Sequence, residues 1–423
     1  MSKQFRNFYP QVDVEALRQE YIGKNVLDLP TPSFIVNKDT IERNCLHMIQ
    51  GAKNIKASFR PHLKTHKTLE ITKFQLGDYS TKVVVSTLRE AWSLIPFYEQ
   101  GRVRDVLYGL PIVKSKIPEL DDLSTYVDTL RILVDNIDQL KLLQEYGREK
   151  PWHIMIKVDM GTSRAGLHYQ SEEFKQLVQA SVDEHSDVVT LDGFYCHAGH
   201  SYSSHSSKEA EDYLYDEIVA GNVAAGYAKS IVPSGKYLVS VGSTPTGHAS
   251  AEIALTKILP VSDNIDEIEL HAGNYALCDL QQWATGCISE DNIACRVLVE
   301  VASTYPGRGK SELGEVLINA GVIGLAREPG QLPGFGLVSS KPYDNWYVDR
   351  VSQEHGILTP FTESTVASIP KPEQIAKEFP PLGTKLLVIP QHACIASNSY
   401  QWYFITDDEG KMVVDVWVPW RGW

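Results

Sequence analysis

The chain of 423 residues has no apolar run that approaches the ~20 residues a membrane-spanning helix needs. Its first residues, Met-Ser-Lys-Gln-Phe-Arg-Asn-Phe, also lack the continuous apolar core of a secretory signal. These two absences predict a cytoplasmic protein that has no membrane partner.

Cysteine is sparse, and there is no excess of positive charge. The six cysteines are scattered along the chain and do not form the dense framework of a secreted disulfide scaffold, so we expect them to be reduced. They are Cys45, Cys196, Cys278, Cys287, Cys295 and Cys394. The net charge of −13 argues against nucleic acid, whose binding relies on a concentrated positive face. Small molecules are the expected partners.

The composition is that of a globular protein, with 43% hydrophobic and 22% charged residues. Because a single core stops growing at roughly 250–300 residues, we expect one large domain and one smaller domain. From residue 33 to about residue 279, short β-branched runs alternate with longer amphipathic stretches, which is typical of βα units around a parallel sheet.

Nine strands are expected in this first region. They are Ser33–Asn37, Ser58–Leu63, Lys82–Thr87, Asp105–Leu110, Arg131–Asp135, His153–Asp159, Gly193–His197, Tyr237–Gly242 and Glu267–Leu270. We interpret the first as a lead-in strand and the other eight as a (β/α)8 barrel over residues 31–285. A doubly wound open sheet is the alternative.

Beyond residue 279 the sequence changes to strands that are not separated by long helices. The expected strands are Ala294–Val301, Val316–Ile323, Lys385–Ile389, Tyr400–Ile405 and Met412–Val418. This pattern predicts an antiparallel β domain over residues 286–423, joined by the N-terminal residues 1–30. Residues 327–365 are rich in Gly, Pro and Ser and are expected to form a loop.

Reactive side chains follow several of the barrel strands, at the ends where barrel active sites lie. The segment Arg60-Pro-His-Leu-Lys-Thr-His places His62, Lys64 and His66 at alternate positions, on one face if the chain stays extended. A lone lysine is usually a solvated surface residue. At a barrel strand's C-terminal end, however, an amine can lose solvent and form a Schiff base.

This segment, with Leu29-Pro-Thr-Pro ahead of a strand, resembles the alanine-racemase-like, fold type III pyridoxal-phosphate enzymes. The branch is that of the D-threonine aldolases and D-serine dehydratases, and the resemblance covers nearly the whole chain. It implies pyridoxal 5′-phosphate as cofactor, with Lys64 as its covalent anchor and as the base that removes the α-proton. It also implies a homodimer, because family sites are completed across a dimer interface.

Two further motifs extend the resemblance. Lys157-Val-Asp-Met-Gly-Thr-Ser-Arg-Ala-Gly resembles the family's K-x-D-x-G-x-x-R-x-G, which implies that Arg164 contacts the cofactor's phenolate oxygen. Alone, this motif would indicate a surface Asp–Arg pair. Tyr195-Cys-His-Ala-Gly-His-Ser-Tyr resembles another family turn and implies Tyr195 and Tyr202 as cofactor contacts, Tyr195 also being a catalytic candidate. His197 alone would more often be a hydrogen-bonded core histidine, but here it is a candidate orienting group.

Glycine-containing turns after the last two barrel strands are candidates for a phosphate site. Val241-Gly-Ser-Thr-Pro-Thr offers small residues and hydroxyls, so that backbone N–H groups can approach an anion, although such turns are common. His271-Ala-Gly-Asn-Tyr resembles the family's final-strand phosphate motif. The candidate residues are Gly242, Ser243, Thr244, Gly273, Asn274 and Tyr275.

A histidine and a cysteine follow the expected strand Lys385–Ile389, in Pro390-Gln-His-Ala-Cys. On an extended chain, His392 and Cys394 would project to one side, and imidazole with thiolate suits Zn²⁺. Two protein ligands leave positions for water and substrate. A bare His-x-Cys pair is a weak motif, but its position resembles the metal site of the branch's dehydratases, which makes both residues candidate zinc ligands and catalytic residues.

The resemblance implies a lyase that eliminates the β-hydroxyl of a D-amino acid, converting D-serine to pyruvate and ammonia. In the D-threonine aldolases the second metal ligand is typically aspartate, so Cys394 favours the dehydratase. The alternatives are D-threonine aldol cleavage, dehydration of another D-3-hydroxy amino acid, and racemisation without a metal. A non-catalytic cofactor-binding protein of the superfamily would be a short single barrel, which residues 286–423 argue against.

Overall fold

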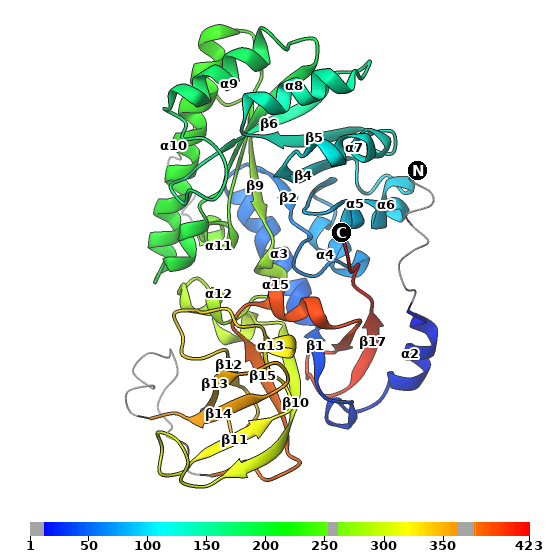
Figure 1. Cartoon of the computed structure of the whole chain (residues 1–423), viewed down its shortest axis with the longest axis vertical. Helices are drawn as coiled ribbons and strands as arrows, with labels where there is room; N and C mark the ends of the chain where they lie inside the picture. Colours follow the sequence, from blue (N-terminus) through cyan, green and yellow to red (C-terminus); the bar gives the residue numbers. More distant parts are fainter. Residues whose placement is uncertain (1–11, 253–260, 363–375, 377) are drawn as a thin grey trace. The chain divides into compact units, whose positions relative to one another are not determined.

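The computed structural model describes residues 12–252, 261–362, 376 and 378–423, which form two compact units (Figure 1). Residues 45–273 lie in the first unit, together with the C-terminal residues 422–423. Residues 12–44 and 274–421 lie in the second. The change in sequence pattern suggests boundaries at residues 31 and 285, whereas the contacts divide the chain at 44/45 and 273/274. No helix within the described ranges is long and apolar enough to cross a membrane.

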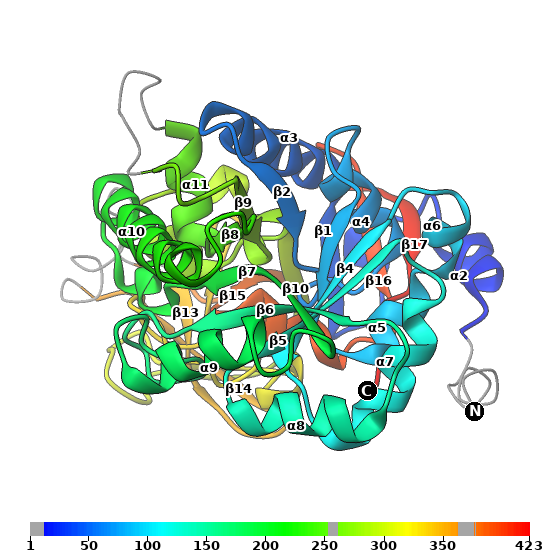
Figure 2. The same ribbon diagram turned by 90° about the horizontal axis from the view of Figure 1, so that it is seen from above.

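The first unit is a parallel barrel surrounded by helices, seen from above in Figure 2. Its strands are β2 (Ser58–Pro61), β3 (Lys82–Val85), β4 (Asp105–Pro111), β5 (Thr129–Val134), β6 (Trp152–Val158), β7 (Val189–Cys196), β8 (Leu238–Val241) and β9 (Glu267–Ala272). The order is β2-β9-β8-β7-β6-β5-β4-β3, and a bridge between His62 and Val84 nearly closes the barrel. These eight strands confirm the barrel prediction, and the open-sheet alternative is wrong.

The barrel helices follow the strands in sequence. They are α3 (Lys38–Asn54), which crosses the division between the units, α4 (Leu69–Leu76), α5 (Leu88–Ser93), α6 (Ile95–Glu99), α7 (Ile117–Ser124), α8 (Ile137–Tyr146), α9 (Glu172–Val182), α10 (Ser207–Ile231) and α11 (Thr244–Glu252). Several begin behind a Ser, Thr or Asn whose side chain accepts a first-turn N–H, as at Thr68, Thr87 and Asn136. Each cap sets where its helix starts, and therefore the length of the preceding strand-to-helix loop.

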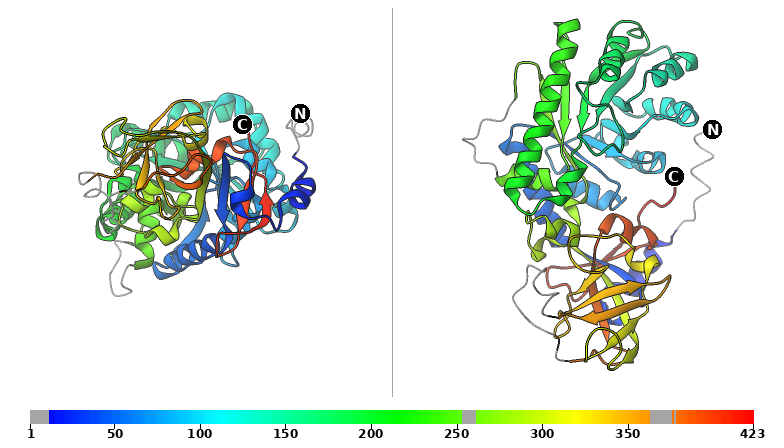
Figure 3. Two further views of the ribbon diagram at one scale, coloured as in Figure 1. Left: turned by 90° about the horizontal axis from the view of Figure 1, so that it is seen from below. Right: turned by 60° about the vertical axis from the view of Figure 1, so that its left-hand side comes forward.

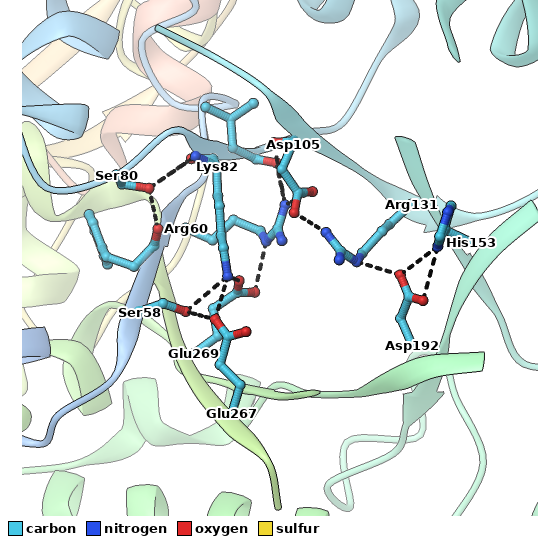
Figure 4. A network of polar contacts seen from close by, with 12 residues as sticks. Ser58, Arg60, Ser80, Lys82, Asp105, Arg131, His153, Asp192, Glu267 and Glu269 are labelled. Carbon is cyan, nitrogen blue, oxygen red and sulfur yellow. Dashed lines mark hydrogen bonds and ion pairs between the residues drawn. The ribbon is translucent and has the colours of Figure 1, made fainter. Parts of the chain in front are cut away.

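A network of charged side chains fills the N-terminal part of the barrel interior (Figure 4). Arg60 on β2 is fully buried; its Nε donates to Glu269 at 2.7 Å and its Nη1 donates to Asp105 at 2.8 Å. The network continues through Ser58, Lys82, Glu267, Arg131, Asp192 and His153. The ion pairs of Arg60 tie β2, which precedes the Lys64 loop, to β9 and β4.

An apolar layer follows the charged layer. It consists of Val84, Leu107, Leu133, Met155, Tyr195 and Leu238. Val84 lies two residues beyond Lys82, and Leu107 lies two beyond Asp105, so each pair points to the same side of its strand. The barrel interior is therefore charged first and apolar next, and polar residues appear again where the strands end.

The second unit is built on a mainly antiparallel sheet, whose yellow and orange strands curl around one another in Figure 3. Its strands are β1 (Ser33–Asn37), β10 (Cys295–Tyr305), β11 (Glu315–Ile318), β12 (Gly336–Val338), β13 (Trp346–Val351), β14 (Gly356–Pro360), β15 (Lys385–Pro390), β16 (Tyr403–Thr406) and β17 (Val413–Trp417). Its helices include α2 (Val14–Tyr21), α12 (Leu280–Ala284), α13 (Val322–Leu325) and α15 (Ala393–Ala396). The order is β11-β14-β13-β12-β15-β10-β1-β16-β17, and β11 also pairs with β10.

Three local expectations are wrong. Strand β1 is not a lead-in to the barrel, because it pairs with β10 and β16, which cover both of its edges. The expected strand Val316–Ile323 stops at Ile318, since the chain turns at Gly321 into helix α13. The expected loop 327–365 contains β12, β13 and β14, whose short runs lack a clear periodicity in sequence. Residues 363–365 lie outside the described residues.

Candidate active site

Lys64 lies in the loop after β2, and its side chain is exposed. Its ammonium has no hydrogen-bond or ion-pair partner within the described part of the chain, whereas nearby Lys67 is paired with Glu90 at 3.2 Å. Its backbone N–H donates to Nδ1 of His62 at 3.4 Å. An unpaired, exposed amine at the end of a barrel strand is available to react with a carbonyl group.

The three alternating residues of the Lys64 segment do not share one face, because the chain turns after β2. His66 is buried, and its Nε2 lies 2.9 Å from Gln75 on α4. Loss of solvent lowers the pKa of His66 to about 4. His66 is therefore a neutral histidine that packs the loop against the helix.

Arg164 is presented by the turn that follows β6. One carboxylate oxygen of Asp159 accepts three successive backbone N–H bonds, from Gly161 at 3.0 Å and from Thr162 and Ser163 at 3.1 Å. Arg164 is exposed and has no ion-pair partner among the described residues. The surface Asp–Arg pair is therefore absent, and the guanidinium is available for an anion.

Aromatic and imidazole rings meet at the C-terminal end of the barrel interior. The buried Tyr195 ring stacks on His271, with centroids 4.1 Å apart, and Nζ of Lys157 lies 4.6 Å from the Tyr195 ring centre. His197 lies 5.7 Å from His271, and its Nδ1 donates to the Gly242 carbonyl at 2.7 Å. Nε2 of the buried His271 has no hydrogen-bond partner in the described chain. The rings therefore leave one buried polar atom open to a ligand.

Positive charge accumulates around these rings. Loss of solvent lowers the pKa of His197 well below its ordinary value, and the cations Lys157, Lys64 and Arg164 lower it further, so its imidazole is neutral. Burial lowers the pKa of Lys157 to about 8. Such a cluster of cations suits a ligand that carries a phenolate, a carboxylate or a phosphate. The barrel residues therefore fit pyridoxal phosphate.

The phosphate candidates on the barrel lie where β8 gives way to α11. The Ser243 hydroxyl is buried, 2.7 Å from the Ser201 hydroxyl and 3.0 Å from that of Thr246. The Ser243 backbone N–H already donates to the Thr246 hydroxyl at 2.8 Å. The N–H groups in the first turn of α11 and these hydroxyls are therefore better candidates than the Ser243 N–H as donors to a phosphate. Thr244 is buried as the first residue of that helix.

Position 242 requires glycine for a different reason from phosphate binding, which its sequence motif suggests. Its φ is +137°, and a Cβ there would lie 2.1 Å from the carbonyl oxygen of His271. Close approach to the backbone of β9 therefore requires glycine at this position, whatever binds nearby. Gly273 is less constrained, since its Cβ would lie 3.3 Å from the Cβ of His62.

The remaining phosphate candidates belong to the second unit. Asn274 and Tyr275 begin a short 3-10 helix and are buried, and the Asn274 amide donates to Asp279 at 2.5 Å. Tyr202, which we expect to contact the cofactor elsewhere, is half-buried in the turn Gly199–Ser203 of the first unit. Because these residues are divided between the units, their joint role in one cofactor site stays a prediction.

His392 and Cys394 do not lie on extended chain, because Ala393 begins helix α15 and His392 is its N-cap. Their side chains nevertheless meet. Although burial alone would lower it, the hydrogen bond to Cys394 and nearby negative charge raise the pKa of His392 to about 9. Within the described ranges, no group of three His, Cys, Asp or Glu residues could hold a metal ion. An imidazole and a thiol that lie side by side are donors that suit Zn²⁺, and their role as metal ligands stays a prediction.

Sequence reasoning missed three residues of the site. Lys157 lies two residues beyond Met155, on the inward face of β6, so alternation along the strand could have indicated it. His271 stands within a motif from which we selected only the later residues. Asp279 had no signal, because it contacts the His392–Cys394 turn from 114 positions away in the chain.

Two family models match this chain. The first is the alanine racemase N-terminal domain, over residues 36–243, and the second is the putative serine dehydratase domain, over residues 294–406. Among solved structures, the D-threo-3-hydroxyaspartate dehydratase from Delftia superposes with a TM-score of 0.77 at 24% identity, covering 95% of this chain and 100% of that one. A variant of the same dehydratase is described as being in the metal-free form. D-Threonine aldolase from Filomicrobium marinum superposes with a TM-score of 0.72 at 21% identity, covering 94% and 97%.

The sequence relatives are closer. The D-serine dehydratase of Schizosaccharomyces pombe is 45% identical over 422 residues, which cover 98% of this chain and 97% of the relative. The D-serine dehydratase of Saccharomyces cerevisiae is 38% identical, covering 96% and 99%. Identity of this extent, over both units, shows that the chain belongs to the D-serine dehydratase family of alanine-racemase-like proteins.

Proposed function

We propose that this protein is a D-serine dehydratase, a lyase that converts D-serine to pyruvate and ammonia with pyridoxal 5′-phosphate and Zn²⁺. The observation that carries the proposal is the 45% identity to the Schizosaccharomyces pombe enzyme over 98% of this chain. The unpaired Lys64 and Arg164 and the pair His392–Cys394 supply the chemistry that such a reaction needs.

The barrel residues would hold the cofactor, whose ring delocalises the electrons left on the α-carbon when the α-proton is removed. Lys64 would hold the cofactor covalently, and its free amine would accept the α-proton of the substrate. Arg164 would supply a permanent cation to the cofactor's phenolate oxygen, as the family resemblance implies. The hydroxyls of Ser243, just before α11, and of Ser201, in the turn Gly199–Ser203, would be donors to the phosphate.

The pair His392 and Cys394 would hold zinc, which as a Lewis acid assists departure of the β-hydroxyl. Hydroxide is a poor leaving group, so this assistance matters for elimination. The bond between the β-carbon and oxygen would break, and the hydroxide would leave as water with the proton that Lys64 removed from the α-carbon. The aminoacrylate that is released then hydrolyses to pyruvate and ammonia.

Dehydration of another D-3-hydroxy amino acid is the second candidate. The D-threo-3-hydroxyaspartate dehydratase of Delftia is 27% identical over 94% of this chain, so the same family accepts a substrate with an additional carboxylate. A D-threonine aldolase of Arthrobacter is more distant, at 23% identity over 93%. Cys394 as a metal ligand favours dehydration over aldol cleavage.

A cytoplasmic homodimer is also part of the proposal. All six cysteines lie in described parts of the chain, and none forms a disulfide, which agrees with a reducing compartment. The dimer is supported by the resemblance to fold type III enzymes, whose sites are completed by a second subunit.

The test combines an absorbance scan with product analysis. Purified protein should have a visible band from the lysine-bound cofactor, which changes with D-serine and does not change with L-serine, and it should release pyruvate. Chelation or Cys394→Ala should suppress pyruvate release while the band remains. Cys287→Ala, which alters a half-buried cysteine of another loop, is the matched control and should keep activity.

Three results would contradict the proposal. Metal-free protein that forms pyruvate at the native rate would exclude zinc assistance. Release of glycine and acetaldehyde from D-threonine as the main reaction would indicate an aldolase. Much faster turnover of D-3-hydroxyaspartate than of D-serine would select the second candidate.

A further inference from the structure

Asp279 is a fully buried carboxylate that joins two loops of the second unit. Its Oδ2 accepts hydrogen bonds from the side-chain amide of Asn274 at 2.5 Å and from the backbone N–H of Ala393 at 2.7 Å. Ala393 is the residue between the two candidate metal ligands, and Asn274 is a candidate cofactor contact. A single oxygen atom therefore binds the metal-ligand turn and a residue of the cofactor loop.

The other carboxylate oxygen has a local role. Oδ1 accepts the N–H of Gln282 at 3.0 Å, so that Asp279 is the N-cap of α12. Three N–H donors thus occupy both oxygens. This arrangement argues against Asp279 as a third metal ligand and agrees with the absence of a three-residue metal group in the described chain.

Capping alone does not explain a buried carboxylate here. Serine or asparagine caps a helix as well as aspartate does. A buried carboxylate needs several hydrogen bonds to offset its loss of solvent. One of the three donors to Asp279 belongs to α12, and the other two are the Asn274 amide and the Ala393 N–H, which lie outside that helix.

We infer that Asp279 is a positioning residue for the metal, holding the Ala393 amide and thereby the angle at which His392 and Cys394 present their donor atoms. The inference rests on the proposed function, because it takes these two residues as metal ligands. Partners that orient metal ligands typically change metal affinity by roughly 10–100-fold when they are removed. An effect of this size is expected because only two protein ligands hold the ion.

The decisive substitution is Asp279→Ser. Serine can still cap α12 through Gln282, but it is too short to reach Ala393 and Asn274 as well. Asp279→Asn is a second variant, which keeps the size of the side chain but removes its charge. Its carbonyl oxygen can accept from Asn274 and Ala393, but its NH2 group then faces the Gln282 N–H, so that two donors meet. Asp279→Glu keeps the charge and should restore part of the metal affinity that the other variants lose.

The experiment titrates full-length, cofactor-loaded, metal-depleted protein with Co²⁺ and follows the cobalt–thiolate absorption. Wild-type protein should bind Co²⁺, and the variants Asp279→Ser and Asp279→Asn should bind Co²⁺ about 10–100-fold more weakly. Ser171→Ala removes an N-cap from α9 in the barrel and controls for the loss of a cap. It should lower stability while leaving Co²⁺ affinity unchanged.

The outcomes separate this inference from the proposed function. If wild-type protein gives no cobalt–thiolate band, or if Cys394→Ala binds Co²⁺ equally well, the proposed metal site fails and the inference fails with it. If wild-type protein binds through Cys394 and a folded Asp279→Ser protein binds with the same affinity, only the positioning role of Asp279 is overturned. Circular dichroism of each variant establishes that it is folded.

Discussion

Arg60 and Glu269 form an ion pair at 2.7 Å, and both side chains are fully buried inside the barrel (Figure 4). Arg60 also begins the segment that ends in Lys64. Burial alone would raise the pKa of Glu269, but the charges of Arg60 and Lys82 lower it to about 2. The strand that leads into the Lys64 loop is thus anchored by charges on the neighbouring strand β9 and on β4.

Glu269→Gln should destabilise the protein by about 3–5 kcal/mol, because it leaves the positive charge of Arg60 buried and only partly compensated. Urea unfolding at neutral pH measures this loss. The double variant Arg60→Met, Glu269→Met removes both charges. Its loss of free energy of unfolding should be much smaller than the sum of the losses of the two single variants. Additive losses in this cycle would show that the two side chains do not stabilise each other.

Glu217, on α10, predicts a pH dependence of stability. Burial raises its pKa to about 8, although a hydrogen bond from the Ala198 N–H, at 2.6 Å, opposes this shift. The unfolded chain loses this proton near its ordinary pKa of about 4.3, so unfolding releases a proton between that pH and about 8. The contribution of Glu217 is therefore greatest below its unfolded pKa and falls as the pH rises toward 8.

Glu217→Gln should remove this fall, so the difference in the free energy of unfolding between wild type and variant should decrease from about pH 5 to about pH 8. Buried histidines such as His66, whose pKa is lowered, make stability rise with pH below about 6.5, but they contribute equally to both proteins. Lys157 does not interfere in this range, since its pKa of about 8 lies below its unfolded value and alters stability only at higher pH. Glu172→Gln, at an exposed position of α9, is the control and should keep the wild-type slope. An unchanged slope in the Glu217 variant would mean that its carboxyl is ionised at neutral pH.

Lys64→Ala should abolish the visible cofactor band and the release of pyruvate together, because it removes both the anchor and the base. The matched variant Lys67→Ala removes a lysine of the same loop that is paired with the buried Glu90. It should lower stability but keep the band. The assignment of Lys64 fails if its alanine variant retains covalently bound cofactor, detected by mass spectrometry after borohydride reduction.

Gly242→Ala should lower the free energy of unfolding by about 2 kcal/mol or more, since the added methyl meets the His271 carbonyl and the backbone is in the left-handed region. Gly199→Ala, in the turn after β7, meets its nearest atom at an ordinary 3.5 Å and should cost less than about 1 kcal/mol. Urea midpoints compare the two. Equal midpoints would contradict the packing explanation for Gly242.

The barrel was predictable because the pattern of each βα unit lies within one continuous stretch of sequence. Alternating or continuous apolar runs indicate the strands, and the residues at their ends, such as Lys64 and Arg164, lie where strands end in any parallel barrel. The second unit was less predictable. Strand β12 has three residues and pairs with the distant β15, and the hairpin of β13 and β14 lies in a Gly-, Pro- and Ser-rich region without a clear local period.

The sequence by itself determined the succession of barrel strands, the positions of the candidate site residues that follow them and, through full-length identity, the family. Only the tertiary structure decided that β1 joins the second sheet, that His271 stacks on Tyr195, and that Asp279 holds the turn between His392 and Cys394. The physical reason is the same in each case. A local pattern specifies which side of an element is buried, whereas the partner it meets, and the hydrogen bonds that make a buried charge tolerable, come from residues brought together only by folding.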